Sequence, residues 1–317
     1  MSTEATSAGR RTSVTARRRL PRAFWHALWT SVAVLVVCAV IGTWSALSYV
    51  DANRQLARLT GRTVGFVTGG SGTTADITWQ TFHASVAMAG NAPPIGTRTQ
   101  IAYDPRNPAD AIIPGAHLLA DADQGRSGLA FAALVALLVL AVDAIWLLRR
   151  LRLRSGQPMT VRRIRVQRRL MSRSWLETEP AAGTRQRWIP VYWDPILAQL
   201  PSPVEVTLHG DPRIDRLVTV EANGILLYPA GRVTAREPLG RRTDSPSQPD
   251  QHALAKARTA GALRQLRVDA ALIVPAPLLG LVWAYLDQGG VPSWCGATAL
   301  CATLAIWLAA IRGSDPT

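Results

Sequence analysis

The run GLAFAALVALLVLAVDAIWLL, residues 128–148, decides the fold class, because Asp143 is its only ionisable side chain. A helix of about 20 apolar residues, rising about 1.5 Å per residue, crosses the hydrocarbon core of a bilayer. Three further segments of similar length and composition occupy residues 24–48, 268–286 and 293–311. The sequence therefore predicts an α-helical membrane protein with four transmembrane helices.

Arginines flank the first two predicted spans and indicate their orientation. Six arginines precede the first span, among them Arg17, Arg18, Arg19 and Arg22, and four directly follow the second: Arg149, Arg150, Arg152 and Arg154. Loops rich in arginine stay on the cytoplasmic side of a membrane. We therefore expect residues 1–23 to be a disordered, basic cytoplasmic tail and residues 51–126 to lie outside. The segment after the second span and the C-terminus would then be cytoplasmic.

The first span has an alternative interpretation as a cleaved signal peptide, with Ala46-Leu47-Ser48 as the cleavage site. Its apolar run is long for a signal peptide, so a signal anchor is favoured. The net charge of +14 would suggest nucleic acid in a soluble protein, but most of these charges adjoin predicted spans. We expect anionic lipid headgroups as the partner and no nucleic acid.

Residues 51–126 show the pattern of a small β module with three or four strands. Residues 63–67, 75–82 and 97–103 are predicted strands, and the glycine-rich residues 69–72 form a hairpin loop between the first two. Asp104-Pro105-Arg106-Asn107 suits a type I turn, since Asp accepts a hydrogen bond at the first position and Pro fixes φ at the second. So few strands bury a marginal core, and we expect the module to pack against the membrane or a partner.

Residues 96–111 resemble a family of bacterial membrane proteins of unknown function, through the motif of Tyr103, Asp104, Pro105, Asn107 and Pro108. In that family a small extracytoplasmic β module lies between two helices and ends in Tyr-Asp-Pro-x-Asn-Pro. The resemblance covers roughly residues 60–115 and implies fold and location, here the bacterial inner membrane, but no activity. Residues 83–92 depart from the family pattern, which has a turn before the last strand.

The strand-like patterns within residues 155–236 predict a second, cytoplasmic all-β domain of five or six strands, which is curled or closed into a small barrel. Its strongest local signal is Asn223-Gly224 between two apolar runs, which is typical of a two-residue hairpin. Residues 237–251, rich in Pro, Gly and Ser, are predicted to be a flexible linker. Residues 252–267 predict a helix, either a solvated stalk or an interfacial helix on anionic headgroups.

Few residues suggest chemistry. Asp143 lies inside the second span, where we expect it to pair with Arg150, the alternative being a relay or gating role. Pro275 and Pro277 are expected to kink the third span, for packing or as a hinge.

The one polar group that resembles an acid–base site is His209-Gly210-Asp211 with Glu205 and Asp215, and it has neither a nucleophile nor metal-ligand spacing beside it. We therefore expect no enzyme activity, no cofactor and no metal site. The sequence favours a non-enzymatic interaction, scaffold or envelope-sensing protein that binds a protein partner through its cytoplasmic β domain. The alternative is a small transporter or channel component, which a water-filled cavity lined by Asp143 would favour.

Overall fold

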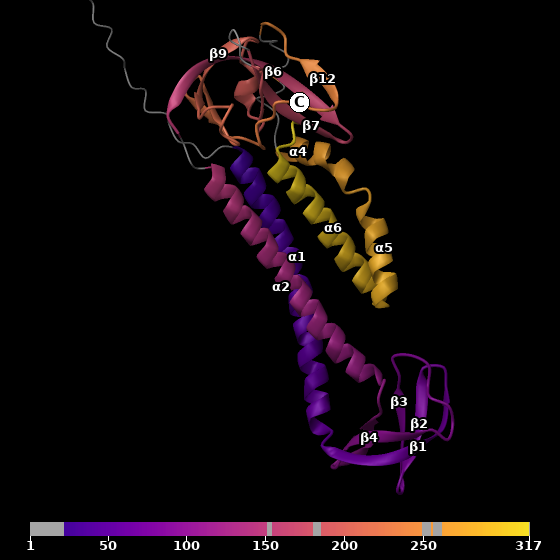
Figure 1. Ribbon diagram of the computed structural model, residues 1–317. Helices are drawn as coiled ribbons and strands as arrows, with labels where there is room; N and C mark the ends of the chain where they lie inside the picture. The colour runs from indigo at the N-terminus through magenta and orange to yellow at the C-terminus, as the bar shows by residue number, and fades with distance from the viewer. Residues whose placement is uncertain (1–21, 151–153, 180–184, 249–254, 256–261, 317) are drawn as a thin grey trace, which may run out of the picture. The chain divides into compact units, whose positions relative to one another are not determined.

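The computed structural model describes residues 22–150, 154–179, 185–248, 255 and 262–316. These residues form two compact units (Figure 1), one from the described residues of 22–34 and 140–316 and the other from residues 35–139. Two long helices, α1 (Arg22–Arg58) and α2 (His117–Arg150), each contribute to both units. About 44% of the structure is helix and 30% is strand, so strands contribute far more than an α-helical fold class implies.

The prediction of four transmembrane helices is wrong. Within the residues that the structure describes, three helices are long and apolar enough to cross a membrane, by length and composition alone: α1, α2 and α6 (Gly290–Arg312). The predicted span 268–286 is instead divided among α4 (Ala262–Asp269), the 3₁₀ turn η2 (Ala270–Leu272) and α5 (Ala276–Asp287). The helix axis bends by 48° at this break.

Two prolines explain the break. Pro275 caps the start of α5, and Pro277 occupies its first turn. Proline has no backbone N–H and its ring clashes with the preceding turn, so a helix that reaches it is interrupted. The twelve residues of α5 extend only about 18 Å, against the ~30 Å of a bilayer core. The expected kink is therefore confirmed, and it is severe enough to remove one continuous span.

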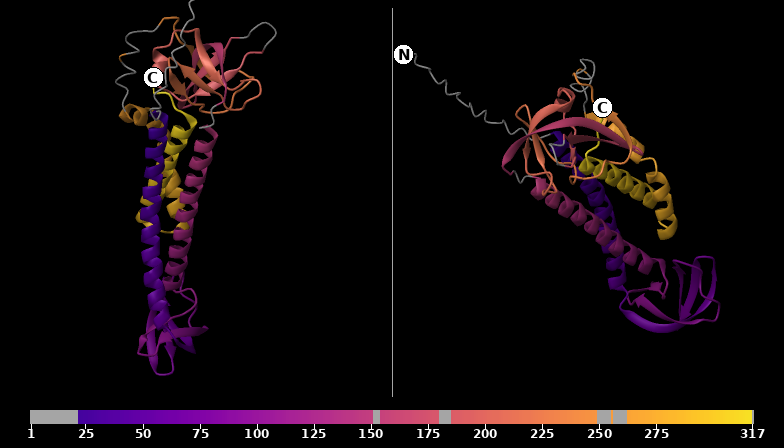
Figure 2. Two further views of the ribbon diagram at one scale, coloured as in Figure 1. Left: turned by 90° about the vertical axis from the view of Figure 1, so that its left-hand side faces the viewer. Right: turned by 45° about the horizontal axis from the view of Figure 1, so that its top comes forward.

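Helices α5 and α6 lie side by side (Figures 1 and 2), in contact along a seam of small residues. A Cβ atom added to Gly280 would lie 2.9 Å from both the backbone nitrogen of Thr298 and the carbonyl oxygen of Trp294. Such close backbone approach is typical of helix pairs in membranes. The Trp294 indole also donates a 3.0 Å hydrogen bond to the carbonyl oxygen of Pro277.

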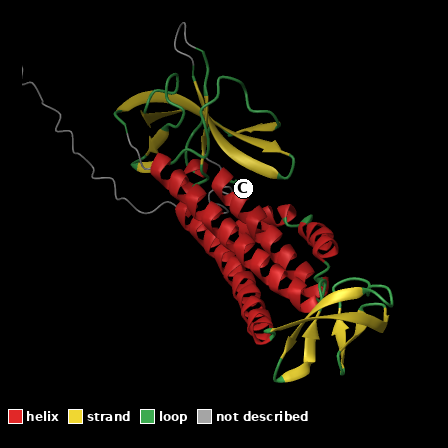
Figure 3. Ribbon diagram, turned by 60° about the horizontal axis from the view of Figure 1, so that its bottom comes forward, coloured by secondary structure: helices red, strands yellow, loops and turns green. Residues whose placement is uncertain are grey.

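The unit of residues 35–139 contains a curled, antiparallel five-stranded sheet (Figure 3). Its order is β3-β2-β1-β4-β5, with strands β1 (Gly61–Ser71), β2 (Thr74–Trp79), β3 (Phe82–Ala87), β4 (Arg98–Asp104) and β5 (Asn107–Ile112). One face buries a core that includes Ile77, Trp79 and Ile101. Five strands thus replace the three or four expected.

In this sheet the structure corrects one predicted strand and confirms one predicted turn. The predicted strand 75–82 is split, because Gln80 adopts a left-handed φ of 51° in a tight turn, and the departing stretch 83–92 begins with β3. The turn at Asp104 is confirmed, since its carboxylate accepts a 2.8 Å hydrogen bond from the Arg106 backbone N–H. Asp104 and Asn107 are paired across the β4–β5 hairpin.

The other unit contains a seven-stranded, barrel-like sheet. Its strands are β6 (Gly156–Arg168), β7 (Met171–Thr178), β8 (Trp188–Val191), β9 (Val204–His209), β10 (Thr219–Ala222), β11 (Ile225–Leu227) and β12 (Arg241–Asp244). The strand order is β11-β10-β9-β6-β7-β8, and β12 pairs with β6 as well. A 3₁₀ turn, η1 (Pro195–Ala198), covers part of its core. Bridges from Val191 to Pro229 and from Trp188 to Thr234 join β8 to the segment after β11 and close the barrel. We call this sheet the β barrel.

The predicted hairpin at Asn223-Gly224 is confirmed. Both residues have positive φ, 49° and 76°, and β10 pairs with β11 across them. The predicted linker 237–251 is only partly irregular, because β12 lies within it and pairs with the edge of β6. Arg242 of β12 stabilises this pairing through ion pairs of 2.8 Å to Glu177 and 3.1 Å to Glu237.

Some expectations fall outside the described residues. These are the tail 1–21 with Arg17, Arg18 and Arg19, then Arg152, residues 249–251 of the predicted linker, and nearly all of 252–261 in the predicted helix 252–267. The described end of that helix is α4, which runs on to Asp269.

Replacing Gly224 with alanine should destabilise the β barrel by about 1–2 kcal/mol, because a Cβ atom is disfavoured at left-handed φ. The added Cβ would meet no atom within 4 Å, so the cost comes from the backbone alone. Hydrogen exchange of residues 219–227 should accelerate correspondingly. Gly90→Ala is the matched control, since Gly90 has neither a positive φ nor a neighbour within 4 Å. Unchanged exchange in Gly224→Ala would contradict the assigned turn.

Candidate functional site

The end of α2 is anchored in the β barrel by a buried arginine. Arg150 is 9% exposed, and its Nε donates a 2.7 Å hydrogen bond to the carbonyl oxygen of Pro229. Its guanidinium carbon lies 4.9 Å from the centre of the Trp146 ring and 5.5 Å from that of Tyr192. A guanidinium over aromatic faces gains a cation–π attraction that strengthens with desolvation. Arg150 therefore has specific partners on the barrel.

Tyr192 connects three elements at the same place. Its hydroxyl accepts a 2.7 Å hydrogen bond from the Trp146 indole and donates to the carbonyl oxygen of Ile311 in α6. Phe24 of α1 packs edge-on against Trp146, with ring centres 4.8 Å apart. Burial raises the pKa of the Tyr192 phenol, against the opposing effect of Arg150, so the hydroxyl stays protonated and can donate. We call Phe24, Trp146, Arg150 and Tyr192 the junction.

The segment after α6 forms a second attachment to the barrel. Ser314 and Asp315 are 4% and 1% exposed. The Asp315 carboxylate accepts a 2.6 Å hydrogen bond from the Ser174 hydroxyl in β7 and lies 3.9 Å from Nη2 of Arg163 in β6. Burial lowers the pKa of Arg163, and Asp315 partly offsets this. Both ends of this ion pair are thus withdrawn from water and held by hydrogen bonds.

A buried polar cluster joins α1, α4 and this segment. The Asp269 carboxylate, 2% exposed, accepts a 3.2 Å hydrogen bond from the Ser314 hydroxyl and lies 3.4 Å from Nε2 of His26. The Gln265 amide donates to the Ser314 hydroxyl at 2.6 Å and to its carbonyl oxygen at 3.0 Å. We call His26, Gln265, Asp269 and Ser314 the polar cluster. Its groups come from segments far apart in the sequence.

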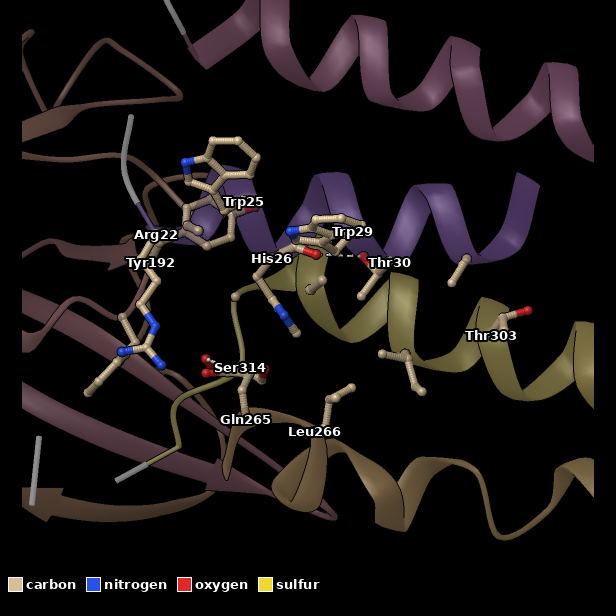
Figure 4. Close-up of a pocket in the computed structure, with 16 residues that line it drawn as sticks. Arg22, Trp25, His26, Trp29, Thr30, Tyr192, Gln265, Leu266, Thr303 and Ser314 are labelled. Atoms are coloured by element: carbon tan, nitrogen blue, oxygen red, sulfur yellow. Dashed lines mark hydrogen bonds between the residues drawn. The ribbon is translucent and has the colours of Figure 1, made fainter. Parts of the chain in front are cut away.

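A cavity of about 560 Å³ adjoins the polar cluster (Figure 4). Its walls come from α1, α4 and α6 and from residues beside them, and they are mainly apolar: Arg22, Ala23, Trp25, His26, Trp29, Thr30, Ala33, Tyr192, Trp193, Gln265, Leu266, Thr303, Ile306, Ala310, Gly313 and Ser314. Figure 4 shows His26 pointing from α1 toward Gln265 and Ser314. Ligand cavities typically measure about 300–1,000 Å³ and combine apolar walls with a few polar groups. This cavity is the candidate functional site.

Of Asp143 and the orienting arginines that the structure describes (Arg22, Arg149, Arg150 and Arg154), only Arg22 lines the cavity. Asp143 accepts a 3.1 Å hydrogen bond from the Trp307 indole and is not a lining residue. The expected partner Arg150 is instead bound to Pro229, while Arg149 is exposed. Arg154 pairs with Asp215 on the barrel. Arg22 lines the cavity, and its guanidinium carbon lies 5.2 Å from the centre of the Trp193 ring.

The acid–base candidates do not form one site. His209 lies 2.9 Å from Glu221 and 3.1 Å from the Arg154 carbonyl oxygen. The Asp211 carboxylate accepts a 2.8 Å hydrogen bond from the Arg213 backbone N–H, as expected of a turn. Glu205 lines a shallower hollow beside Glu221. Within the described residues, no group of three or more His, Cys, Asp or Glu side chains is arranged to hold a metal ion.

The residues of the polar cluster escaped sequence analysis. His26, Gln265 and Ser314 belong to no motif, and Asp269 lies at the edge of the predicted third span. One usable signal was present: an acid at position 269 and prolines at 275 and 277 argue against a continuous apolar helix. The contacts themselves join residues 45 and 49 positions apart or more, which periodicity cannot reveal.

Replacing Tyr192 with phenylalanine should lower the free energy of unfolding by about 1–3 kcal/mol, because the buried Trp146 indole loses its acceptor. The measurement is the thermal midpoint of the full chain in mild detergent, followed by tryptophan fluorescence. Tyr285→Phe provides the control, since Tyr285 is 82% exposed. Equal midpoints for the two variants would show that the junction contributes nothing to stability.

Comparison with known proteins returns no similar family model, curated protein or solved structure. Function must therefore be inferred from the junction, the polar cluster and the cavity.

Proposed function

We propose that this chain is a non-enzymatic protein of the bacterial inner membrane that holds its β barrel at the cytoplasmic surface for a protein partner. The junction is the observation that supports this most strongly, since α2 and α6 form hydrogen bonds with the barrel there and Phe24 of α1 packs against Tyr228 of the barrel. Separating the barrel from the helices would break the hydrogen bond from Arg150 to Pro229 and expose the aromatic rings of Trp146 and Tyr192 to water. The arrangement suits a scaffold or a sensor in which helices and barrel move together.

The proposed location rests on apolarity and charge. Three helices could span a membrane. The ends of two of them that face the barrel carry exposed arginines, Arg149 and Arg312. Arginine at a helix end favours the cytoplasmic side and attracts anionic headgroups. We infer that the barrel, the start of α1 and the end of α6 face the cytoplasm and that the five-stranded sheet lies outside. The resemblance around Tyr103 agrees with that inference.

The barrel offers exposed apolar side chains to a partner. Leu170, 58% exposed, lies in the turn between β6 and β7, and Leu239, 75% exposed, precedes β12. Because β12 pairs with the same end of β6, both leucines belong to one end of the sheet. Exposed apolar groups that are close together are typical of interaction surfaces. This end of the barrel is the proposed contact.

The partner proposal predicts that Leu170→Glu combined with Leu239→Glu abolishes co-purification. The full chain would be cross-linked in native membranes, purified in mild detergent, and its partners quantified by mass spectrometry. A carboxylate placed in an apolar contact should weaken it by several kcal/mol, enough to lose a stoichiometric partner.

Ile95→Glu is the matched control, because Ile95 is 72% exposed but lies outside the barrel, in the loop between β3 and β4. It should leave the barrel's partner bound. A wild-type chain recovered without any stoichiometric protein would overturn the scaffold proposal. Equal loss in both variants would move the contact away from the barrel.

A further inference from the structure

We propose that the cavity between α1, α4 and α6 binds one acyl chain of an anionic phospholipid, with the headgroup phosphate at its polar end. This site is independent of the proposed partner, because none of the residues that line it belongs to the end of the barrel with Leu170 and Leu239. Three features carry the inference: the chemistry of the walls, the charge at the polar end, and the exposure of the side chains at the rim.

The walls suit a hydrocarbon chain. Ala33, Leu266 and Ile306 present aliphatic groups from three different helices, and Trp29 adds an indole face. A cavity of about 560 Å³ with such walls is expensive to fill with water, since water there finds few hydrogen-bond partners. Burying methylene groups in it is favourable by about 0.8 kcal/mol each. An apolar chain is therefore the occupant that best satisfies the walls.

The polar end contains one permanent cation, the Arg22 guanidinium. Among the described lining residues, Arg22, His26 and Tyr192 are the ionisable side chains and none is a carboxylate, while Asp194 interacts electrostatically with Arg22 from outside the lining. The Asp269 carboxylate, which accepts from the Ser314 hydroxyl, lies 3.4 Å from Nε2 of His26. Nε2 of His26 is buried and has no hydrogen-bond acceptor or donor beyond the 3.4 Å approach to Asp269. A phosphate accepts a charge-assisted hydrogen bond from arginine and an ordinary hydrogen bond from an imidazole N–H.

Two exposed tryptophans lie at the rim of the cavity. Trp25 is 49% exposed and Trp29 is 65% exposed, both on the first turns of α1 (Figure 4). Tryptophan prefers the boundary between headgroups and hydrocarbon, where its ring is apolar and its N–H can reach polar groups. Because α1 is one of the helices apolar enough to cross a membrane, these indoles put the opening at headgroup depth. A lipid can enter such an opening from the bilayer without passing through water.

The broken helix explains why space exists here. Gln265 and Leu266 of α4 line the cavity, whereas no residue of α5 does. A straight helix would have continued the α5–α6 contact along the last turns of α6, where Thr303, Ile306 and Ala310 now line the cavity. The 48° bend at the prolines carries α4 away from that path. The cavity is thus a consequence of Pro275 and Pro277.

Native mass spectrometry of the full chain tests the proposal. The purified protein would be incubated with vesicles containing equal amounts of dioleoyl phosphatidylglycerol and dioleoyl phosphatidylcholine, then returned to detergent. We expect one phosphatidylglycerol to remain bound per chain. Ala33→Phe, which places a ring in the cavity, should reduce the retained lipid roughly tenfold, equivalent to about 1.4 kcal/mol.

Two controls make the result specific. Ala133→Phe adds the same ring at an exposed position of α2 that does not line the cavity, and should retain the lipid. Arg22→Gln should remove the preference for phosphatidylglycerol over phosphatidylcholine, whereas Arg54→Gln, at an exposed position of α1, should keep it.

Equal retention by Ala33→Phe and Ala133→Phe would overturn the assigned site, and so would a wild-type chain without bound lipid. Equal binding of both lipids by the wild type would overturn the anionic headgroup. Each of these results is read separately from partner binding, because a chain that holds lipid but no protein partner would contradict only the scaffold proposal.

Discussion

The burial of Arg150 is the constraint on which the larger unit depends. A guanidinium withdrawn from water must find hydrogen-bond acceptors, because an unpaired buried charge costs several kcal/mol. Its acceptors are the carbonyl oxygens of Pro229 and, at 3.4 Å, Trp146, and two aromatic faces complete its surroundings. Pro229 belongs to the segment that closes the barrel. Barrel closure and the attachment of α2 therefore rely on the same few residues.

The break between α4 and α5 is a second feature on which the larger unit depends. Missing N–H groups at Pro275 and Pro277 end one helix and start another, and the polar residues of α4 then face the segment after α6. Had the helix stayed straight, Asp269 would have needed another partner at the edge of an apolar span. The break, the polar cluster and the cavity are thus parts of one arrangement.

Local signals in the sequence predicted local structure well. Asn223-Gly224 and Asp104-Pro105 fixed two hairpins, since turn conformations depend on adjacent residues. The apolar runs gave three helices that could span a membrane, although α1 and α2 extend beyond their apolar parts. The failure came at 268–286, where the two prolines were expected to kink a continuous span and instead break it into α4, η2 and α5. Average apolarity measures composition and contains no information about backbone continuity.

The candidate site could not be predicted in the same way, because its contacts are distant in sequence. Trp146 and Tyr192 are 46 residues apart, and Ser174 and Asp315 are 141 apart. Which residues meet depends on how the barrel closes and where α4 turns, and neither follows from periodicity. His26 is an example. In the sequence it is an isolated histidine in an apolar segment, and only the structure shows that it lies 3.4 Å from the buried Asp269 carboxylate.

Arg149 and Arg150 show how adjacent identical residues take different roles. Both would favour cytoplasmic retention while α2 inserts, because the chain is made from the N-terminus and the barrel strands follow α2. Once the barrel folds, Arg150 is buried against Pro229 whereas Arg149 stays exposed. A charge that first helps to orient a helix would then hold a domain to it. Under the proposed topology, the positive-inside pattern and the junction are therefore compatible, since one would act during insertion and the other after the barrel folds.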